Sequence, residues 1–272
     1  MDSFISNIRT SSPMILNLTN YVTANDVANV LLALGASPCM SDSFEEMDDM
    51  TDVAQGVNIN IGTVNSQTVS AMLLAGIYGN QKGLPCVLDA VGVGASSYRT
   101  KTAKTLINHI HFSLIKGNIS EIKALFGKDS HTEGVDASED DLIDETNLQQ
   151  ALSFVMKKAK KHKTIILATG PIDIIADGAS AYLIHNGCKQ MAQVTGTGCQ
   201  LSALLCATLA ANGSRNLEAA AKMVCAMGIV GEMSVSCLEP GEGNASLRTK
   251  MIDRFCYIDD ATIEKMSRYE IQ

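Results

Sequence analysis

The stretch PCVLDAVGVGASSYRTKTAKTLINHIHFSLIKGNISEIKALF, residues 85–126, decides the fold class. Its apolar spacing predicts a short buried strand at Pro85–Asp89, an amphipathic helix at Arg99–His109, a second strand at Phe112–Ile115 and a helix at Ile119–Phe126. A strand, a crossover helix and another strand at this spacing form a unit in which the two strands run parallel. The stretch therefore predicts a parallel sheet covered by helices.

The same alternation continues toward the N-terminus. Strands are predicted at Met14–Leu18 and Val57–Ile61, and a helix is predicted at Ser66–Tyr78. A helix at Ala24–Leu34 has an N-cap signal at Thr23 and a stop signal at Gly35. These elements extend the strand–helix pattern outward from residues 85–126.

The alternation also continues toward the C-terminus. A strand is predicted at Thr164–Ala168, and helices are predicted at Leu148–Lys161, Cys199–Ala211, Leu217–Ser236 and Ala245–Phe255. Two short segments, Ile172–Ile175 and Ala181–Ile184, are followed by Asp-Gly and Asn-Gly, which predict hairpins. The polar, acidic stretch Lys128–Thr146 is expected to be a surface loop with a turn of helix.

No linker, repeat or shift in composition interrupts this pattern. We therefore expect a single α/β domain over residues 1–272, with a mostly parallel central sheet and helices on both faces. In such sheets, ligands bind beyond the carboxyl ends of the strands.

Composition narrows the function classes. The chain has 21 Lys and Arg against 29 Asp and Glu, a net charge of −8, and 46% hydrophobic residues, which suit a large core and disfavour nucleic-acid binding. The apolar stretch Leu201–Ala211 is shorter than the roughly 20 residues that span a bilayer, and the first residues lack the pattern of a signal peptide. With eight cysteines and no C-x-x-C, we expect a cytoplasmic protein with reduced thiols and no membrane partner.

Polar and glycine-rich residues follow most of the predicted strands. They are Thr19-Asn20, Gly62-Thr63, Asp89 with Val91–Ala95, Lys116–Asn118 with Glu121, and Thr169-Gly170. Because the carboxyl ends of parallel strands share one edge of the sheet, these residues are expected to converge there. The sequence thus predicts a site that combines carboxylates, a lysine and glycine-rich turns.

The segment Thr195–Cys199 leads straight into an apolar helix. Its glycines let backbone N–H groups converge at the positive end of that helix, which would form an anion site. Cys199 would then be a thiol of lowered pKa, able to act as a base or nucleophile. The alternative interpretation is a tight turn before a core helix.

Asp89, Glu121 and Lys116 each allow two interpretations. The two carboxylates could hold a hydrated Mg²⁺ at neighbouring strand ends. From the residues alone the stronger interpretation is that they are helix-capping groups, with Glu121 pairing with Asn118 in a capping box. Lys116 could meet a phosphate as a point charge, or be an ordinary solvated lysine at a strand end.

Several common motifs are missing from the sequence. It has no P-loop, no complete G-x-G-x-x-G and no G-x-S-x-G. The residues by themselves therefore indicate a phosphoryl-transfer site on an α/β fold without identifying the acceptor.

The motifs together resemble the hydroxyethylthiazole kinase family, which is related to the ribokinase-like kinases. The matching stretches are Leu18–Asn20, Ala28–Met40, Asn60–Thr63, Leu88–Ala95, Ile115–Ile122, Ala168–Gly170 and Val194–Cys199. They occur in the family's order and run through most of the chain. The resemblance implies a ribokinase-like three-layer sandwich. It also implies an alcohol-directed phosphotransferase that moves the γ-phosphoryl group of ATP to the primary hydroxyl of 4-methyl-5-(2-hydroxyethyl)thiazole, in thiamine salvage.

The resemblance also implies roles for individual residues. The thiazole would be bound by Asn20, Met40, Thr63 and Gly196, and ATP by Lys116, Asn118 and Thr169. Mg²⁺ would be held, directly or through water, by Asp89 and Glu121. The amides of Gly196, Thr197, Gly198 and Cys199 would form an anion hole for the transferring group. Cys199 occupies the position where related sugar kinases carry an aspartate base.

Two residues depart from the family pattern. Most relatives have Asp-Pro where this chain has Asp89-Ala90, and many have Arg where it has Lys116. Neither change removes a required charge, although Lys loses the bidentate geometry of Arg. The family is trimeric with sites between subunits, which implies a homotrimer in which Met40 completes a neighbour's pocket.

Three other functions compete with this one. A ribokinase-like kinase of another small alcohol would usually carry Asp at position 199 in place of Cys199. A non-catalytic thiazole sensor would not need the groups for phosphoryl transfer. A cysteine hydrolase would need a histidine near Cys199, and the motifs place none there.

Overall fold

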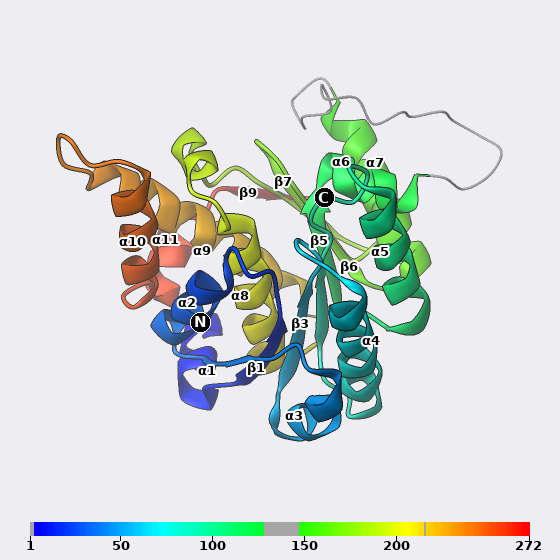
Figure 1. Cartoon of the computed structure of the whole chain (residues 1–272). Helices are drawn as coiled ribbons and strands as arrows, with labels where there is room; N and C mark the ends of the chain where they lie inside the picture. The colour runs from blue at the N-terminus through cyan, green and yellow to red at the C-terminus, as the bar shows by residue number, and fades with distance from the viewer. Residues whose placement is uncertain (1–2, 128–146, 215) are drawn as a thin grey trace.

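A computed structural model describes residues 3–127, 147–214 and 216–272. A nine-stranded sheet in the order β2-β1-β3-β4-β5-β6-β7-β8-β9 lies between two layers of helices, which Figure 1 shows on either side of it. The strands are β1 (Met14–Leu18), β2 (Ser37–Met40), β3 (Gly56–Asn60), β4 (Cys86–Asp89), β5 (Leu114–Asn118), β6 (Ile165–Thr169), β7 (Asp173–Ala176), β8 (Ala181–Ile184) and β9 (Tyr269–Ile271). All neighbours from β2 to β6 pair in parallel, whereas β7, β8 and β9 add antiparallel pairs. The expected three-layer α/β architecture with a mostly parallel sheet is confirmed.

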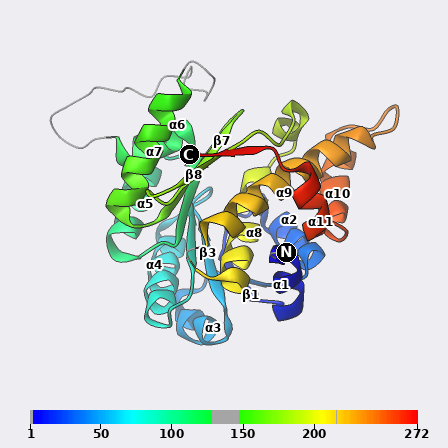
Figure 2. The same ribbon diagram turned by 180° about the vertical axis from the view of Figure 1, so that it is seen from behind.

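The helices separate onto the two faces of the sheet. One layer contains α1 (Phe4–Ser11), α2 (Ala24–Leu34), α8 (Thr197–Asn212), α9 (Leu217–Ser236), α10 (Asn244–Phe255) and α11 (Asp260–Met266). The other contains α3 (Met47–Val53), α4 (Ser66–Gln81), α5 (Ser97–His109), α6 (Ile119–Phe126) and α7 (Leu148–His162). The view from behind in Figure 2 shows the same separation, with β9 entering the sheet from the C-terminal end of the chain.

Alternation along the strands builds a core on each face. Leu16 of β1 packs into the cluster under α4–α7, whereas its neighbour Ile15 packs into the cluster under α8 and α9. The same division separates Leu88 from Val87 in β4. Parallel strands covered on both faces are mostly apolar, and β4 and β6 of this sheet follow that rule apart from their last residues, Asp89 and Thr169.

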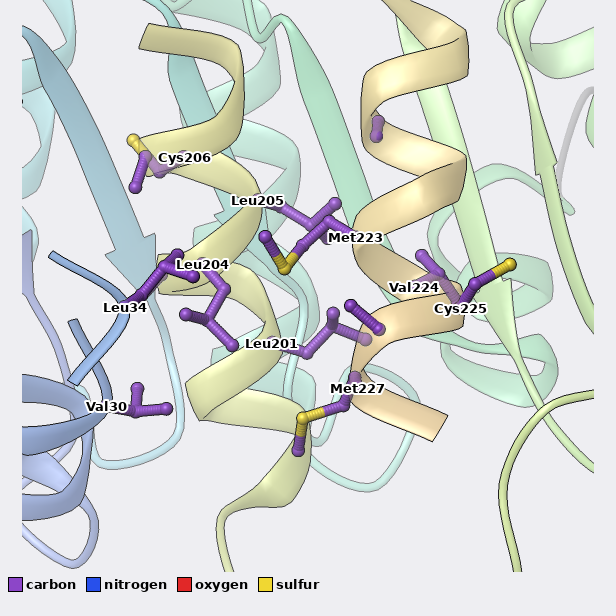
Figure 3. Close-up of a cluster of buried hydrophobic side chains, with 14 of the residues drawn as sticks. Val30, Leu34, Leu201, Leu204, Leu205, Cys206, Met223, Val224, Cys225 and Met227 are labelled. Carbon is purple, nitrogen blue, oxygen red and sulfur yellow. The ribbon is translucent and has the colours of Figure 1, made fainter. Parts of the chain in front are cut away.

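Helices α8 and α9 are buried on most of their sides. Figure 3 shows Leu201 and Leu204 of α8 between Val30 of α2 and Met227 of α9. Among the described residues, α9 alone has the length and hydropathy of a membrane span, which the sequence analysis did not recognise. Since 78% of its most apolar window is buried in the structure, α9 is the core helix of this layer.

A group of buried amides lies on one face of the sheet. Asn17, Asn58 and Asn60 are buried in β1 and β3 on the face that α8 covers, because their neighbours Leu16 and Ile59 belong to the opposite cluster. Buried amides must be hydrogen-bonded to be tolerated. This polar patch lies directly beneath the start of α8, where the site is built.

Several sequence predictions are corrected here. The second hairpin, predicted at Asn186-Gly187, is wrong, because the next strand that pairs with β8 is β9, near the end of the chain. The Asn186 side chain instead donates to the carbonyl oxygen of Met266 and accepts from the N–H of Arg268. The strand expected at Phe112–Ile115 begins two residues later and runs to Asn118. Thr23 precedes α2 as expected, but its hydroxyl bonds Asn20 and does not cap the helix. The segment Lys128–Thr146 lies outside the described residues.

Candidate active site

A first cavity of about 260 Å³ opens at the carboxyl ends of β1, β2 and β3. Its wall combines the apolar side chains of Leu18, Met40 and Met72 with the polar side chains of Asn60 and Thr63. Thr63 is fixed there because its Oγ1 accepts a hydrogen bond from the backbone N–H of Tyr21 at 3.3 Å. A space of this size and lining suits a small, largely apolar molecule that carries one or two polar groups.

A second cavity of about 640 Å³ opens beyond β5 and β6. Asn118, Thr169 and Asp173 contribute polar groups from the strand ends, and Thr197 and Gly198 contribute the first turn of α8. Its remaining wall is apolar, from Leu201, Val224 and Met227. The second cavity is therefore large enough for a nucleotide, with a helix N-terminus at one end for phosphates.

A buried ion pair joins Asp89, the last residue of β4, to Lys116, which lies within β5 and not after it as the sequence predicted. Lys116 Nζ donates to Asp89 Oδ1 at 2.9 Å, and the two side chains are 7% and 0% exposed. Burial by itself would lower the pKa of Lys116, but the charge of Asp89 and its hydrogen bond outweigh burial and raise that pKa. Lys116 therefore stays a cation inside the protein.

Lys116 also faces the N-terminus of α8. A Cβ at Gly198 would lie 2.7 Å from Lys116 Nζ, so only glycine lets the ammonium approach this turn so closely. Gly196 precedes the helix with φ +86°, a left-handed conformation that favours glycine. No side chain caps the first turn of α8, so its N–H groups are available to a ligand. Together with the Lys116 cation they form an anion site.

Cys199 belongs to the same cluster. It is 8% exposed, and its Sγ accepts a hydrogen bond from Asn20 Nδ2 at 3.3 Å. Asn20 is held in turn by Asn60 Oδ1 at 3.0 Å, and Asn60 donates to Asp89 Oδ2 at 2.7 Å. The thiol, the asparagines and the ion pair therefore form one connected network between the two cavities.

Glu121 has a capping role. Its Oε2 accepts the backbone N–H of Asn118 at 2.7 Å in a capping box of α6, and its Oε1 accepts the N–H of Gly92 at 2.7 Å. Burial raises the pKa of Glu121, although these hydrogen bonds and Lys116 act against it. The structure thus bears out the capping interpretation, and Glu121 also joins the glycine-rich turn after β4 to the start of α6.

The carboxylates fit a metal that keeps its water shell. Among the described residues, no cluster of three His, Cys, Asp or Glu side chains could hold an ion by itself. Each oxygen of Asp89 and Glu121 already accepts one hydrogen bond and retains a second lone pair. This donor set suits Mg²⁺ that is bound largely by water and phosphate oxygens, and it does not suit a metal enclosed by protein ligands.

Asp173 is a titratable group that the sequence analysis did not single out. It lines the second cavity, and its Oδ1 accepts the N–H of Gly170 at 2.9 Å. Burial raises its pKa from 3.8 to about 7, although the Gly170 hydrogen bond and the charge of Lys116 act against the rise. The carboxyl therefore changes charge near neutral pH within this cavity.

Asp173→Asn is expected to change the pH dependence of stability. Between about pH 4 and pH 7 only the unfolded chain ionises at Asp173, so the free energy of unfolding falls as pH rises through this range. Asn keeps the acceptor for Gly170 and removes the charge. Urea unfolding gives the free energy of unfolding of the variant minus that of the natural protein. This difference should be more favourable to the variant by roughly 1–3 kcal/mol at pH 8 than at pH 5. An equal difference at both pH values would contradict this assignment.

The structure brings most of the expected site residues together. Met40 and Thr63 line the first cavity and Asn118 and Thr169 the second, while Asn20, Asp89, Lys116 and Cys199 lie in the network between the cavities. Gly196 lines neither cavity and packs on Thr23. Met40 lies in the cavity of its own chain, and its contribution to a neighbour's pocket stays a prediction.

Comparisons with known proteins agree with this geometry. The model of the hydroxyethylthiazole kinase family matches residues 5–260. A curated hydroxyethylthiazole kinase from Clostridium acetobutylicum is 44% identical over 98% of this chain and 97% of its own length. A solved hydroxyethylthiazole kinase structure from Pyrococcus horikoshii has a TM-score of 0.86 and 31% identity, covering 99% of this chain and 97% of that chain.

A more distant structure is similar in fold alone. A ribokinase-like superfamily protein from Enterococcus faecalis has a TM-score of 0.56 at 14% identity, covering 94% of this chain and 91% of that chain. The ribokinase-like sandwich expected from the sequence is thereby supported.

Proposed function

Because the chain belongs to the hydroxyethylthiazole kinase family, we propose that it transfers the γ-phosphoryl group of ATP to the primary hydroxyl of 4-methyl-5-(2-hydroxyethyl)thiazole. The observation that carries the proposal is the pair of cavities that flank one anion site at Lys116 and the start of α8. Such a site can hold a phosphoryl group while it passes between two ligands.

Cavity size and lining assign the ligands. The first cavity would take the thiazole, whose ring and methyl group suit Leu18, Met40 and Met72. The second cavity would take ATP, with the base against Leu201, Val224 and Met227 and the phosphates at Thr197 and Gly198. Asn118 and Thr169, at neighbouring strand ends, would contact the nucleotide.

The network between the cavities would perform the transfer. As the thiazole hydroxyl oxygen bonds to the γ-phosphorus, the bond to the β-phosphate oxygen breaks and ADP leaves. The N–H groups of Gly196, Thr197, Gly198 and Cys199, together with Lys116, would stabilise charge on the transferring group. Cys199 Sγ would accept the hydroxyl proton, while Asn20 holds the sulfur in place.

Magnesium would enter with ATP. Asp89 and Glu121 would hold it through water, because each of their oxygens keeps a free lone pair. The ion would neutralise phosphate charge during the transfer.

We also propose that this single-domain protein works in the cytoplasm as a homotrimer with sites between subunits. Exposed side chains support an assembly: Tyr21 and Met40, which line the first cavity, are 82% and 39% exposed in one chain. Val22 and Phe44, close to them in the sequence, are 59% and 48% exposed. Light scattering would test it, because a trimer has three times the chain mass of 28.9 kDa. A monomer mass at micromolar concentration would contradict it.

ADP release is the test of the activity. The protein is mixed with MgATP and one of three alcohols: the thiazole, 4-amino-5-hydroxymethyl-2-methylpyrimidine or ribose. We expect release with the thiazole alone. Release with only another alcohol would keep the kinase fold and discard the roles of Met40 and Thr63. Thiazole binding without release by folded protein would favour a sensor.

A further inference from the structure

Asn60 occupies the centre of the polar network. Its side chain, 1% exposed at the carboxyl end of β3, makes three hydrogen bonds. Nδ2 donates to Asp89 Oδ2 at 2.7 Å, while Oδ1 accepts from Asn20 Nδ2 at 3.0 Å and from the Gly62 N–H at 2.9 Å. The orientation of the amide follows from its partners, because a carboxylate can only accept and a backbone N–H can only donate.

Through these partners, Asn60 is connected to Lys116 on one side and to Cys199 on the other. Beyond Asp89, the other carboxylate oxygen holds Lys116 at 2.9 Å, beside the start of α8. Beyond Asn20, the amide nitrogen reaches Cys199 Sγ at 3.3 Å. Asn60 therefore joins the cation of the anion site to the thiol through an unbroken series of hydrogen bonds.

Asn20 is itself fixed from a third direction. Its Oδ1 accepts both the N–H and the hydroxyl of Thr23 at 3.0 Å, so the Asn20 amide cannot turn over without losing these bonds. If Asn60 were lost, Asn20 would keep its contact with Thr23, but Asp89 Oδ2 would lose its donor. The main consequence would be a misdirected Asp89 and, through it, a displaced Lys116.

We propose that Asn60 is a positioning residue for phosphoryl transfer, which orients the Asp89 carboxylate toward Lys116 and, together with Thr23, holds Asn20 on the Cys199 thiol. The inference rests on the proposed kinase activity. It does not require Asn60 to touch the transferring group, although Asn60 also lines the first cavity. A small error in the placement of such groups lowers turnover strongly.

Asn60→Asp tests this role through its pH dependence. When the introduced carboxyl is protonated, it has the shape of the amide and can donate to Asp89 while it accepts from Asn20 and Gly62. When it is ionised, it cannot donate, and it repels Asp89 at hydrogen-bond distance. We expect kcat at pH 8 to be about 100-fold below that of the natural enzyme. The ratio of variant to natural kcat should recover about tenfold or more by pH 6.

Asn58→Asp is the matched control. Asn58 is a fully buried amide two residues earlier on β3, on the same face, and it donates to Asn17 Oδ1 at 2.9 Å. It therefore controls for a carboxylate buried in this strand without contact to Asp89. Its kcat relative to the natural enzyme should not recover at low pH. A flat ratio for Asn60→Asp, or the same recovery in Asn58→Asp, would overturn the proposal.

Asn60→Ala covers the case in which the Asp variant does not fold at pH 8. A positioning role predicts a kcat that is about 30-fold lower while the KM for ATP stays within about threefold. A purely structural role predicts lower thermal stability with kcat unchanged, and that result would overturn the inference. Lack of turnover by the natural enzyme in the same assay would instead overturn the proposed function.

Discussion

Asp89→Asn is expected to lower kcat by at least about 100-fold and to destabilise the fold by about 3–5 kcal/mol. The Asp89 side chain is completely buried and accepts hydrogen bonds from Lys116 and Asn60. Asn leaves the Lys116 ammonium buried without its counter-charge, a state that costs far more than the pair contributes when intact. Steady-state kinetics and urea unfolding on the same preparation measure the two effects.

Asp26→Asn separates catalysis from stability. Asp26 of α2 is also buried, at 5% exposure, and forms an ion pair with Arg248 of α10 on the outer side of the helical layer. The Arg248 side chain is 43% exposed, so water can replace the lost partner and the destabilisation should be smaller. Its kcat should equal that of the natural enzyme. Equal losses of kcat in the two variants would contradict a catalytic role for Asp89.

Cys199 is expected to tolerate a carboxylate better than a methyl group. Cys199→Ala removes the proton acceptor and should lower kcat by about 100-fold. Cys199→Asp restores a base that can accept the same hydrogen bond from Asn20 Nδ2, so turnover should be retained or raised. The measurement is kcat for each variant with MgATP and the thiazole.

Cys206→Ala controls for the loss of a thiol from the same helix. Cys206 is completely buried in the core cluster of α8, and its Sγ lies 3.9 Å from the carbonyl oxygen of Pro85. This variant should lose stability without a change in kcat. If Cys199→Ala had the kcat of the natural enzyme, or if a folded Cys199→Asp had none, Cys199 would not be the base.

The sequence predicted the fold best where local signals mark an element's ends. Helix α2 has the expected bounds because Gly35, with φ +104°, ends it, and α6 begins as expected at the Asn118 capping box. Strands β2 and β9 were not predicted. Both lie at the edges of the sheet, and their residues are strands only because distant segments, β1 and β8, pair with them. The wrong hairpin at Asn186-Gly187 has the same origin, since local turn chemistry does not reveal a partner 80 residues away.

The edge of the sheet that holds the site could be predicted from the sequence, but the hydrogen bonds between its side chains could not. The rule that ligands bind beyond parallel strands brought Asp89 and Lys116 together correctly, although Lys116 lies within β5 and not after it. The sequence did not indicate the central place of Asn60 in the network, because its partners Asn20 and Asp89 are 40 and 29 positions away. The sequence did contain one signal for it. β3, a central strand covered on both faces, carries Asn58 and Asn60, and buried amides need hydrogen-bond partners.

A crystal structure of the protein with the thiazole, Mg²⁺ and a non-hydrolysable ATP analogue tests the central claim most directly. We predict the thiazole beside Met40 and Thr63, the nucleotide beside Thr169 and Leu201, and the hydroxyl oxygen about 3–3.5 Å from the γ-phosphorus at the start of α8. The account would be contradicted by the thiazole in the second cavity and the nucleotide in the first, or by a γ-phosphate directed away from Lys116 and Cys199.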